Sequence, residues 1–450
     1  MKKESNQTLT DLFCQIVREG KSGNIPNDVY DQSKICFLDW LSCVVAGNEE
    51  PIVKKMKRYA QTIGGNKQAS ILMTGEKTSV LNATIVNAAA AHIMGNDDTS
   101  TIYIGHSSAS LMPGLLSLSE WQDKSGLDFL RAHIIAFKIA SILGEITGLT
   151  PYQKGFWTTT TVGGIAAAAG CSYLLDLDEL QTSYALGIAA GTASGLKSVF
   201  GSEAKAYHIG HMASSAISAA ILGKEQVTCS EMLENIDGYL QVYKGSINID
   251  GVEKYLNGYD EFDHLAQKYH ASCHFTHSAI EAIERISTKN TLKISDIDAI
   301  EIQASDLGVK AAGKTVINTI LDAKFSAIYC VANKLLRGKT GIDVFTEENI
   351  KDPAILSFMK KITLKTNIAL KPMESKVTVT LSNGNRLSET VDVFSEIPTL
   401  DIKREKIIQK FYANCKKAFP EEKISRLVEM IMNLQKVDTM RLVAEELKSR

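Results

Sequence analysis

The sequence predicts a mostly α-helical protein, in which a large, discontinuous all-helical domain carries a smaller α+β lid domain. Three observations favour this fold class. Apolar residues recur at helical spacing near both ends of the chain, over residues 7–60 and again after Pro398. Residues 81–223 form long runs rich in alanine, glycine and serine, which are typical of closely packed helices. From about residue 290 the pattern changes to the apolar–polar alternation of strands.

The N-terminal part is predicted to be helical apart from one short extended stretch. Two or three amphipathic helices are expected in 7–60, where residues such as Leu9 and Phe13 share one face. Residues 61–80 contain a Gly-Gly connection and a short segment that we expect to be extended. The uncharged stretch 155–175 is long enough for a membrane span, but its threonines and glycines favour a buried helix of a globular protein.

The C-terminal part combines strands with a helix and then becomes helical again. Strands are expected at 298–304, 376–381 and 386–393, with a helix over 323–337 and a Ser-Asn-Gly-Asn turn at 382–385. Amphipathic helices follow at 407–419, 424–434 and 439–447. We expect these last helices to pack back onto the first ones. The predicted helical domain is therefore 1–265 with 398–450, and the predicted lid domain is 266–397.

The composition excludes several classes of function. A formal net charge of −2 on 450 residues provides no basic field for binding nucleic acid or a membrane surface. The eight cysteines form no Cys-x-x-Cys pair, and no secretory signal is recognised, so we expect reduced thiols and a cytoplasmic protein. No Gly-x-Gly-x-x-Gly or P-loop pattern occurs, which removes the usual nucleotide-binding signals.

One polar loop between two apolar runs is the first candidate for chemistry. It contains His92, Asp97, Asp98, Thr99 and His106 between an alanine-rich run and a second apolar run. Titratable side chains placed between buried helices are costly unless they are paired or used. The sequence therefore predicts a site in this loop.

Three further segments supply candidate partners. All nine histidines fall between residues 92 and 277, which favours a site in that half of the chain. The candidate segments are Phe200 to His211, with Lys205 at a helix start, Lys268 to His277, and Ala323 to Tyr329. For Lys205, anion binding at a helix N-terminus and a plain solvated surface lysine remain equally good interpretations.

A metal site is an alternative interpretation of the second segment. His270, His274 and His277 have a spacing that could place them on one helix face, and Asp97 or Asp98 could supply oxygen ligands. No recognised zinc signature supports this spacing, so structural and hydrogen-bonding roles are favoured and no metal ligand is assigned.

Taken together, these segments resemble the MmgE/PrpD family over nearly the whole length. The segments that carry the resemblance are His92 to Thr99, His106 to Ser108, Gly155 to Thr159, Gly201 to Gly210, Lys268 to Cys273, Ala323 to Ser326 and Val437-Asp438. The resemblance implies a helical domain with an α+β lid, a homodimer, no metal or organic cofactor, and a small di- or tricarboxylate substrate.

The resemblance also implies which residues form the site. The implied catalytic residues are Thr99, His106, Lys205, Lys268 and Tyr329. His106 would act as acid and base at the carbon next to a carboxylate, the two lysines would hold carboxylates, and Thr99 and Tyr329 would orient substrate or relay a proton. The residues expected to contact substrate are Asp97, Asp98, Trp157, Lys205, His208, Lys268 and Cys273.

The chain departs from the family pattern at several positions. Gly95 and Trp157 replace a common aspartate and histidine, Ser107 replaces a proline, and one extra residue lies between Thr99 and His106. The favoured hypothesis is a lyase, either a dehydratase or a decarboxylase, with a dicarboxylate epimerase as the alternative. A metal-dependent hydrolase and a non-catalytic family member are the remaining hypotheses. Gly95 and Trp157 favour the latter, and the retention of His106, Lys205, Lys268 and Tyr329 together argues against it.

Overall fold

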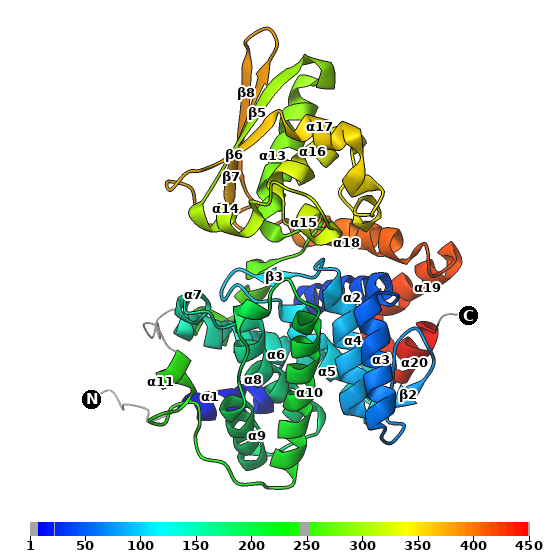
Figure 1. The fold of residues 1–450 in the computed structure, drawn as a ribbon. Helices are drawn as coiled ribbons and strands as arrows, with labels where there is room; N and C mark the ends of the chain where they lie inside the picture. The colour runs from blue at the N-terminus through cyan, green and yellow to red at the C-terminus, as the bar shows by residue number, and fades with distance from the viewer. Residues whose placement is uncertain (1–7, 22, 244–251, 449–450) are drawn as a thin grey trace. The chain divides into compact units, whose positions relative to one another are not determined.

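A computed structural model describes residues 8–21, 23–243 and 252–448 of the chain (Figure 1). The described residues form two compact units. The larger unit contains those of Met1–Gln267 and Thr399–Arg450, and the smaller unit contains Lys268–Pro398. The larger unit is therefore discontinuous in sequence, and the fold as a whole is mostly α-helical, as predicted.

The larger unit is built from helices with a few two-residue strands. Its helices are α1 (Leu9–Glu19), α2 (Asn27–Gly47), α3 (Pro51–Ile63), α4 (Val80–Ile93), α5 (Ser107–Trp121), α6 (Gly126–Thr147), α7 (Thr150–Gln153), α8 (Thr158–Leu174), α9 (Glu179–Gly191), α10 (Ala204–Lys224), α11 (Tyr239–Tyr243), α12 (Glu253–Asn257), α18 (Leu400–Cys415), α19 (Glu421–Met432) and α20 (Arg441–Glu446). Its strands are β1 (Ala69–Ser70), β2 (Lys77–Thr78), β3 (Thr99–Ser100) and β4 (Leu265–Ala266), which pair as β1–β2 and β3–β4, both antiparallel.

Local sequence explains where these helices begin and how deeply they lie. α1 begins at Thr8, whose side chain accepts from the Asp11 N–H while the Asp11 carboxylate accepts from the Thr8 N–H. α6 has the same arrangement at Ser125 and Asp128. All residues of α8 are buried, which agrees with its small, uncharged composition. Within the described ranges, no helix is long and apolar enough to cross a membrane.

The smaller unit packs helices against a four-stranded sheet. Its main helices are α13 (His274–Asn290), α14 (Asp306–Ala312), α15 (Ile320–Lys324), α16 (Ala327–Arg337) and α17 (Pro353–Met359). Its strands are β5 (Ile297–Ala304), β6 (Ile362–Thr366), β7 (Glu374–Leu381) and β8 (Arg386–Asp392), in the order β6–β5–β7–β8. β5 pairs parallel with β6, and the β5–β7 and β7–β8 pairs are antiparallel.

Most predicted elements of the smaller unit are confirmed, with two differences. The β7–β8 hairpin forms at the predicted turn, where Gly384 adopts a φ of +83°. The single helix predicted over 323–337 is instead two helices, because Ser326 is extended and its side chain caps α16 by accepting from the Tyr329 N–H. The edge strand β6 and the helices α14 and α17 were not predicted.

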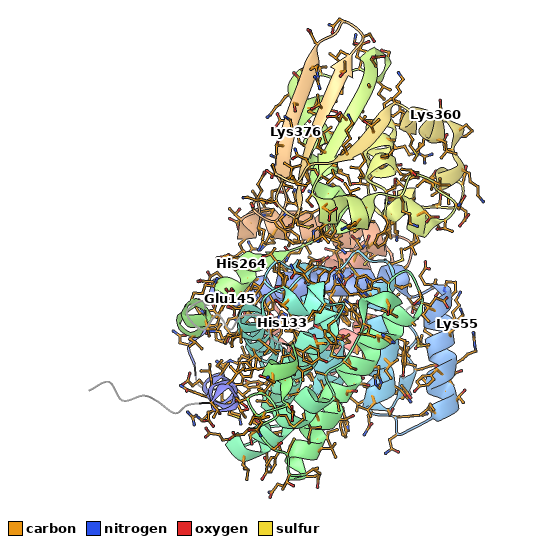
Figure 2. The ribbon with its side chains drawn as sticks, turned by 60° about the vertical axis from the view of Figure 1, so that its left-hand side comes forward. Lys55, His133, Glu145, His264, Lys360 and Lys376 are labelled. Carbon is orange, nitrogen blue, oxygen red and sulfur yellow. The ribbon has the colours of Figure 1, made fainter. Side chains whose placement is uncertain are left out.

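One histidine outside the candidate segments has a structural role in the core. His133, labelled in Figure 2, lies within the larger unit, fully buried, with Nδ1 2.8 Å from the Ser33 hydroxyl oxygen. Burial lowers the pKa of His133 to about 3, so this imidazole is neutral in the folded protein near neutral pH.

Candidate functional site

The predicted polar loop lies between α4 and α5 and brings two histidines together. His92 is in the last turn of α4, and His106 is the N-cap residue of α5. The centroids of the two imidazole rings are 5.0 Å apart, in an edge-to-face arrangement. The intervening chain contains β3, whose Thr99 and Ser100 pair with Ala266 and Leu265. Two residues far from the loop in sequence therefore hold it in place.

Two glycines permit the tight path of this loop. Gly95 has a φ of +62°, in the left-handed region, and no atom lies within 4 Å of the position a Cβ would take. An aspartate here would have room for its side chain but would adopt a backbone conformation that non-glycine residues rarely take. At Gly105 a Cβ would lie 2.2 Å from the Tyr103 ring, so only glycine fits beside His106.

Asp97 joins the two histidines. Its Oδ2 atom is 2.8 Å from Nδ1 of His92 and 3.4 Å from Nδ1 of His106. The side chains of His92 and Asp97 are 1% and 0% exposed, and that of His106 is 17% exposed. Because a carboxylate oxygen accepts hydrogen bonds from ring N–H groups, Asp97 restrains the orientation of both imidazoles.

The backbone carbonyl group of Asp98, the residue after Asp97, determines the tautomer of His106. Its Nδ1 atom lies 2.7 Å from the carbonyl oxygen of Asp98, and 3.5 Å from the hydroxyl oxygen of Thr99. Because a carbonyl oxygen can only accept, Nδ1 carries the hydrogen and Nε2 is the basic nitrogen of the neutral ring. The backbone N–H of His106 donates to the hydroxyl oxygen of Thr159, 3.0 Å away.

The Asp98 side chain has a different role from its carbonyl. Its carboxyl group accepts hydrogen bonds from the backbone N–H and the hydroxyl of Ser108, in the first turn of α5. The residue is 0% exposed, and burial raises its pKa from 3.8 to about 7. Asp98 therefore anchors the start of the helix that carries His106, and its carboxyl group shows no surface to a ligand.

A second group of side chains surrounds Lys205, in the first turn of α10. Its Nζ atom lies 5.4 Å from the ring centroid of Trp157 and 5.0 Å from that of Phe200. The Trp157 ring centroid is in turn 5.7 Å from that of His92. The indole, 1% exposed, thus contacts both the histidine cluster and the lysine.

The remaining predicted residues are divided between the units. His208 is on α10 of the larger unit, where it lines a separate groove. Lys268, Cys273 and Tyr329 belong to the smaller unit. Cys273 is the N-cap residue of α13, and the Tyr329 hydroxyl is buried without a hydrogen-bond partner among the described residues. Burial raises the pKa of Tyr329 to about 12, so it is a phenol that can donate.

The three histidines of the metal hypothesis do lie close together. The His277 ring centroid is 4.8 Å from that of His270 and 4.5 Å from that of His274, but only His274 and His277 are on α13. Nε2 of His277 lies 3.3 Å from the carbonyl oxygen of Ser272, which requires that nitrogen to be a donor. Burial and the nearby His274, His270 and Lys268 lower the pKa of His277 well below its ordinary value.

A different trio has the spacing of metal ligands. Atoms of His92, Asp97 and His106 lie within 4.8 Å of one another. In both histidines, however, Nδ1 is the atom that lies against an oxygen, Asp97 Oδ2 for His92 and the Asp98 carbonyl for His106. A donating Nδ1 atom has no lone pair for a cation, whereas the Nε2 atom of each neutral ring keeps one. The arrangement can therefore move a proton through Nε2 of His106, and the same Nε2 atoms are the nitrogen ligands that a cation would use.

Several members of the site were not singled out from the sequence. Thr159 and Ser108 hold His106 and Asp98, and Phe200 covers Lys205. Lys410, on α18, is buried and forms a 2.5 Å ion pair with Asp39, while its Nζ donates to the carbonyl oxygen of Asn96 in the loop. No local pattern marks Lys410 for this contact, since 314 residues separate it from Asn96.

The fold and the site define a class: a two-unit, mostly helical protein with an imidazole–carboxylate cluster in the loop before α5. The MmgE/PrpD N-terminal domain model matches residues 11–250, and the MmgE/PrpD C-terminal domain model matches residues 270–436. The chain belongs to the MmgE/PrpD family.

Curated relatives match along nearly their whole length. The cis-aconitate decarboxylase of Homo sapiens is 22% identical over 459 residues, which cover 98% of this chain and 95% of that protein. The cis-aconitate decarboxylase-like protein oryM of Aspergillus oryzae is 23% identical, covering 95% and 94%. The mitochondrial 2-methylcitrate dehydratase of Yarrowia lipolytica is 22% identical, covering 88% and 82%.

Proposed function

We propose that this protein is a lyase that acts at the carbon next to a carboxylate of a small di- or tricarboxylate, without a cofactor. The observation that carries the proposal is the contact between Nδ1 of His106 and the Asp98 carbonyl oxygen, which makes Nε2 the basic nitrogen. A neutral imidazole with a defined basic nitrogen is the commonest general base of enzymes near neutral pH. Asp97, 3.4 Å from Nδ1, stabilises the imidazolium that forms when Nε2 takes a proton.

Cations are the second requirement of this chemistry. Removing a proton or carbon dioxide next to a carboxylate leaves an electron pair that is delocalised onto the carboxylate oxygens. Lys205 is the candidate in the larger unit, where two aromatic rings lie beside its ammonium group and reduce its contact with water. We assign the same function to Lys268 in the smaller unit. Thr99, close to His106, and Tyr329 are proposed to orient substrate or relay a proton.

The proposed step balances for either outcome. In dehydration, Nε2 of His106 removes the proton from carbon, the carbon–carbon double bond forms as the carbon–oxygen bond breaks, and the leaving hydroxyl takes that proton from the imidazolium to depart as water. In decarboxylation, the carbon–carbon bond to the carboxylate breaks, carbon dioxide leaves, and the carbanion takes a proton from Nε2 of His106, which enters this reaction as the imidazolium and regains its proton from water afterwards. Both outcomes have support in the relatives, whose names are decarboxylases and a dehydratase.

The test is turnover in deuterium oxide with cis-aconitate, citrate, 2-methylcitrate and related di- and tricarboxylates, followed by NMR. We expect one of them to lose water or carbon dioxide, with deuterium entering the product of a decarboxylation. His106→Ala should reduce the rate by about 10²–10⁴-fold, the usual contribution of a general acid–base. A His106→Ala protein that turns over the true substrate at the wild-type rate would exclude the proposal. Inversion of a stereocentre without loss of a fragment would indicate an epimerase instead.

A further inference from the structure

The turn that leads into His106 contains a strained residue. Ser100 and Gly105 form an antiparallel bridge, in which the Ser100 N–H donates to the Gly105 carbonyl oxygen at 2.8 Å, so residues 101–104 make a tight turn. Ile104, the last residue of this turn, has a φ of +50°, in the left-handed region. A β-branched residue rarely takes this conformation, because its Cβ then crowds the following carbonyl oxygen. Ile104 therefore keeps it only where surrounding contacts hold it.

Helix α8 holds the chain on both sides of Gly105. The hydroxyl of Thr158, the first residue of α8, donates to the Ile104 carbonyl oxygen at 3.2 Å. The hydroxyl oxygen of the next residue, Thr159, accepts from the His106 N–H at 3.0 Å. Both threonines are 0% exposed, which removes bulk water as an alternative partner for their hydroxyls. The turn is thus attached to α8 through one backbone group before the glycine and one after it.

Tyr103 restricts how the turn could relax. Its ring is 0% exposed and packs against two glycines. A Cβ at Gly105 would lie 2.2 Å from this ring, and a Cβ at Gly144 of α6 would lie 2.8 Å from it. The ring therefore cannot shift without displacing backbone. If Ile104 left the left-handed region, the residue that would move is His106.

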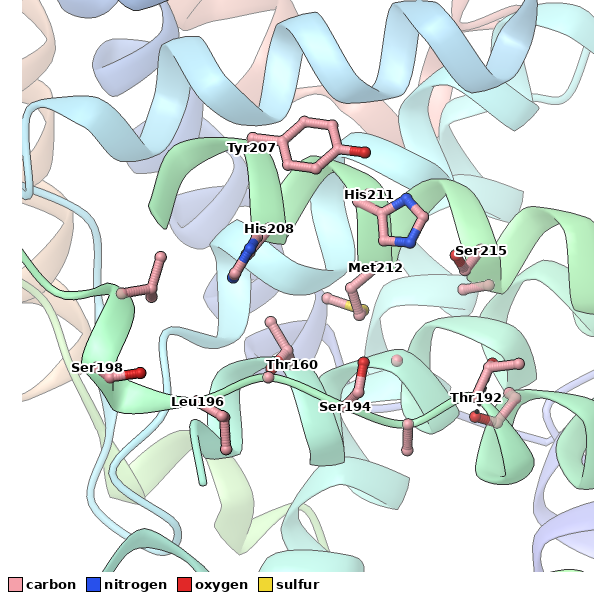
Figure 3. A pocket seen from close by; sticks show the side chains of 16 residues that line it. Thr160, Thr192, Ser194, Leu196, Ser198, Tyr207, His208, His211, Met212 and Ser215 are labelled. Carbon is pink, nitrogen blue, oxygen red and sulfur yellow. Dashed lines mark hydrogen bonds between the residues drawn. The ribbon is translucent and has the colours of Figure 1, made fainter. Parts of the chain in front are cut away.

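A third threonine of α8 differs from the first two. The Thr160 hydroxyl donates to the carbonyl oxygen of Trp157, the N-cap residue of its own helix, at 2.9 Å. Figure 3 shows Thr160 on the other side, in a groove between α10 and the segment that carries Ser194. Thr160 is 1% exposed, so it matches Thr158 in residue type, helix turn and burial while its hydroxyl bonds within the helix.

We propose that Thr158 is a positioning residue for His106. By holding Ile104 in its strained conformation, the Thr158 hydroxyl determines where the turn places His106, and thereby whether Nδ1 reaches the Asp98 carbonyl oxygen, 2.7 Å away. The cost of a left-handed β-branched residue and the contribution of one hydrogen bond are similar in size, so the loss of this bond is sufficient to let the turn relax. The importance of Thr158 for catalysis rests on the proposed function of His106 as the general base.

The first measurement needs no substrate. The ring nitrogens of His106 are observed by NMR at pH 8 in the full-length protein containing nitrogen-15-labelled histidine, and His106→Asn assigns the signals. In wild type we expect a single neutral tautomer with its hydrogen on Nδ1. Thr158→Val keeps the shape of the side chain and lacks the donor. In this variant we expect the two nitrogen shifts to move toward each other, because both tautomers become populated.

The second measurement is the rate with a substrate identified by the deuterium oxide experiment. Thr158→Val should lower kcat about tenfold and change KM by less than about twofold, because a misplaced base slows the chemical step without weakening binding. Thr158→Ser restores the hydroxyl and should recover both kcat and the ring signals. Thr160→Val is the matched control and should behave as wild type. Thr158→Ala lacks the same hydroxyl and replaces Thr158→Val if that variant does not fold.

A double-mutant cycle tests the strain itself. Glycine adopts the left-handed conformation without a Cβ clash, so the turn of Ile104→Gly has no tendency to leave it. Adding Thr158→Val to Ile104→Gly should therefore lower kcat by less than about threefold and leave the ring signals of His106 unchanged. An equal loss in both backgrounds would show that the hydroxyl does not act on the strain, and would overturn the proposal.

Three further outcomes would overturn it: wild-type ring signals in Thr158→Val, equal changes in Thr160→Val, or no recovery in Thr158→Ser. Failure of the proposed function gives a different result. In that case His106→Ala turns over the substrate at the wild-type rate, while the ring signals still show whether Thr158 positions the imidazole.

Discussion

Nδ1 of His106 and the carbonyl oxygen of Asp98 are 2.7 Å apart, and the side chain of that same aspartate anchors the helix His106 begins. One residue thus acts twice on the proposed base. Its carbonyl determines which ring nitrogen carries the hydrogen, and its carboxyl group accepts from Ser108 at the helix start. The position and tautomer of His106 therefore depend on the conformation of this loop. Substitutions in the loop are expected to test the role of His106.

Asp98→Asn should change how stability depends on pH. Burial raises the pKa of Asp98 from 3.8 to about 7, so the folded protein holds this proton more tightly than the unfolded chain does. The stabilisation that the protonated Asp98 carboxyl group contributes is complete below about pH 4 and is lost as pH rises through about 7. At about 1.4 kcal/mol per pKa unit, the loss amounts to roughly 4 kcal/mol. The free energy of unfolding of both proteins is measured with urea at pH 4, 6 and 8. We expect that of Asp98→Asn to increase relative to that of wild type as pH rises. Parallel pH profiles would contradict the prediction.

His133→Asn should act in the opposite direction. The buried imidazole has a pKa of about 3, below the ordinary 6.5, so the unfolded chain takes up a proton that the folded protein refuses. Because of this group, the free energy of unfolding of the wild-type protein should fall by about 2 kcal/mol between pH 7 and pH 5. The asparagine does not titrate and should remove that part of the acid sensitivity. Unchanged sensitivity to acid in the variant would show that His133 is not its source.

Lys410→Met should destabilise the larger unit and its loop. The ammonium group pairs with Asp39, 1% exposed, and donates to the carbonyl oxygen of Asn96. Removing one partner of a buried ion pair costs about 3–5 kcal/mol, because the other charge is left buried. Urea unfolding should show this loss, and the double variant Asp39→Asn with Lys410→Met should recover part of it. Lys417→Met, at an exposed position just after α18, is the control, and an equal effect there would refute the specific role of Lys410.

Lys205→Met should impair the reaction without unfolding the protein. The side chain is half-buried and near the exposed start of α10, so a small change in melting temperature is expected. Loss of the cation should lower kcat/KM by about 10²-fold, equivalent to about 3 kcal/mol. Lys224→Met, at the exposed end of the same helix, should behave as wild type. If both variants retained full activity, Lys205 would not bind the substrate.

Purified protein should contain less than stoichiometric zinc, iron or manganese. The prediction rests on the proposed cofactor-independent reaction, in which Nε2 of His106 must keep its lone pair for a proton. Elemental analysis by mass spectrometry after dialysis provides the measurement. One equivalent of a transition metal that disappears in Asp97→Ala would instead assign this trio as ligands, and would favour the hydrolase hypothesis.

Sequence reasoning predicted the parts of the fold that local patterns determine. The alternation and turn residues of the β7–β8 hairpin, the uncharged composition of α8 and the helical spacing of the last helices all act over a few residues. The strand β6 was missed because its pairing with β5 joins segments about sixty residues apart, and only five residues carry the signal. The break before α16 depends on one serine cap that helical periodicity does not reveal.

The candidate site, like the fold, has features that the sequence predicts and features that only tertiary packing determines. The sequence by itself determined the family, the polar loop and the identity of His106, Thr99 and Lys205 as candidates, because these depend on residue type and order. Only the tertiary structure decided that Asp97 joins two imidazoles, that Asp98 acts through its carbonyl, and that Lys410 reaches the loop from α18. The physical reason is distance along the chain: contacts between residues brought together by packing leave no spacing pattern for a reader to find.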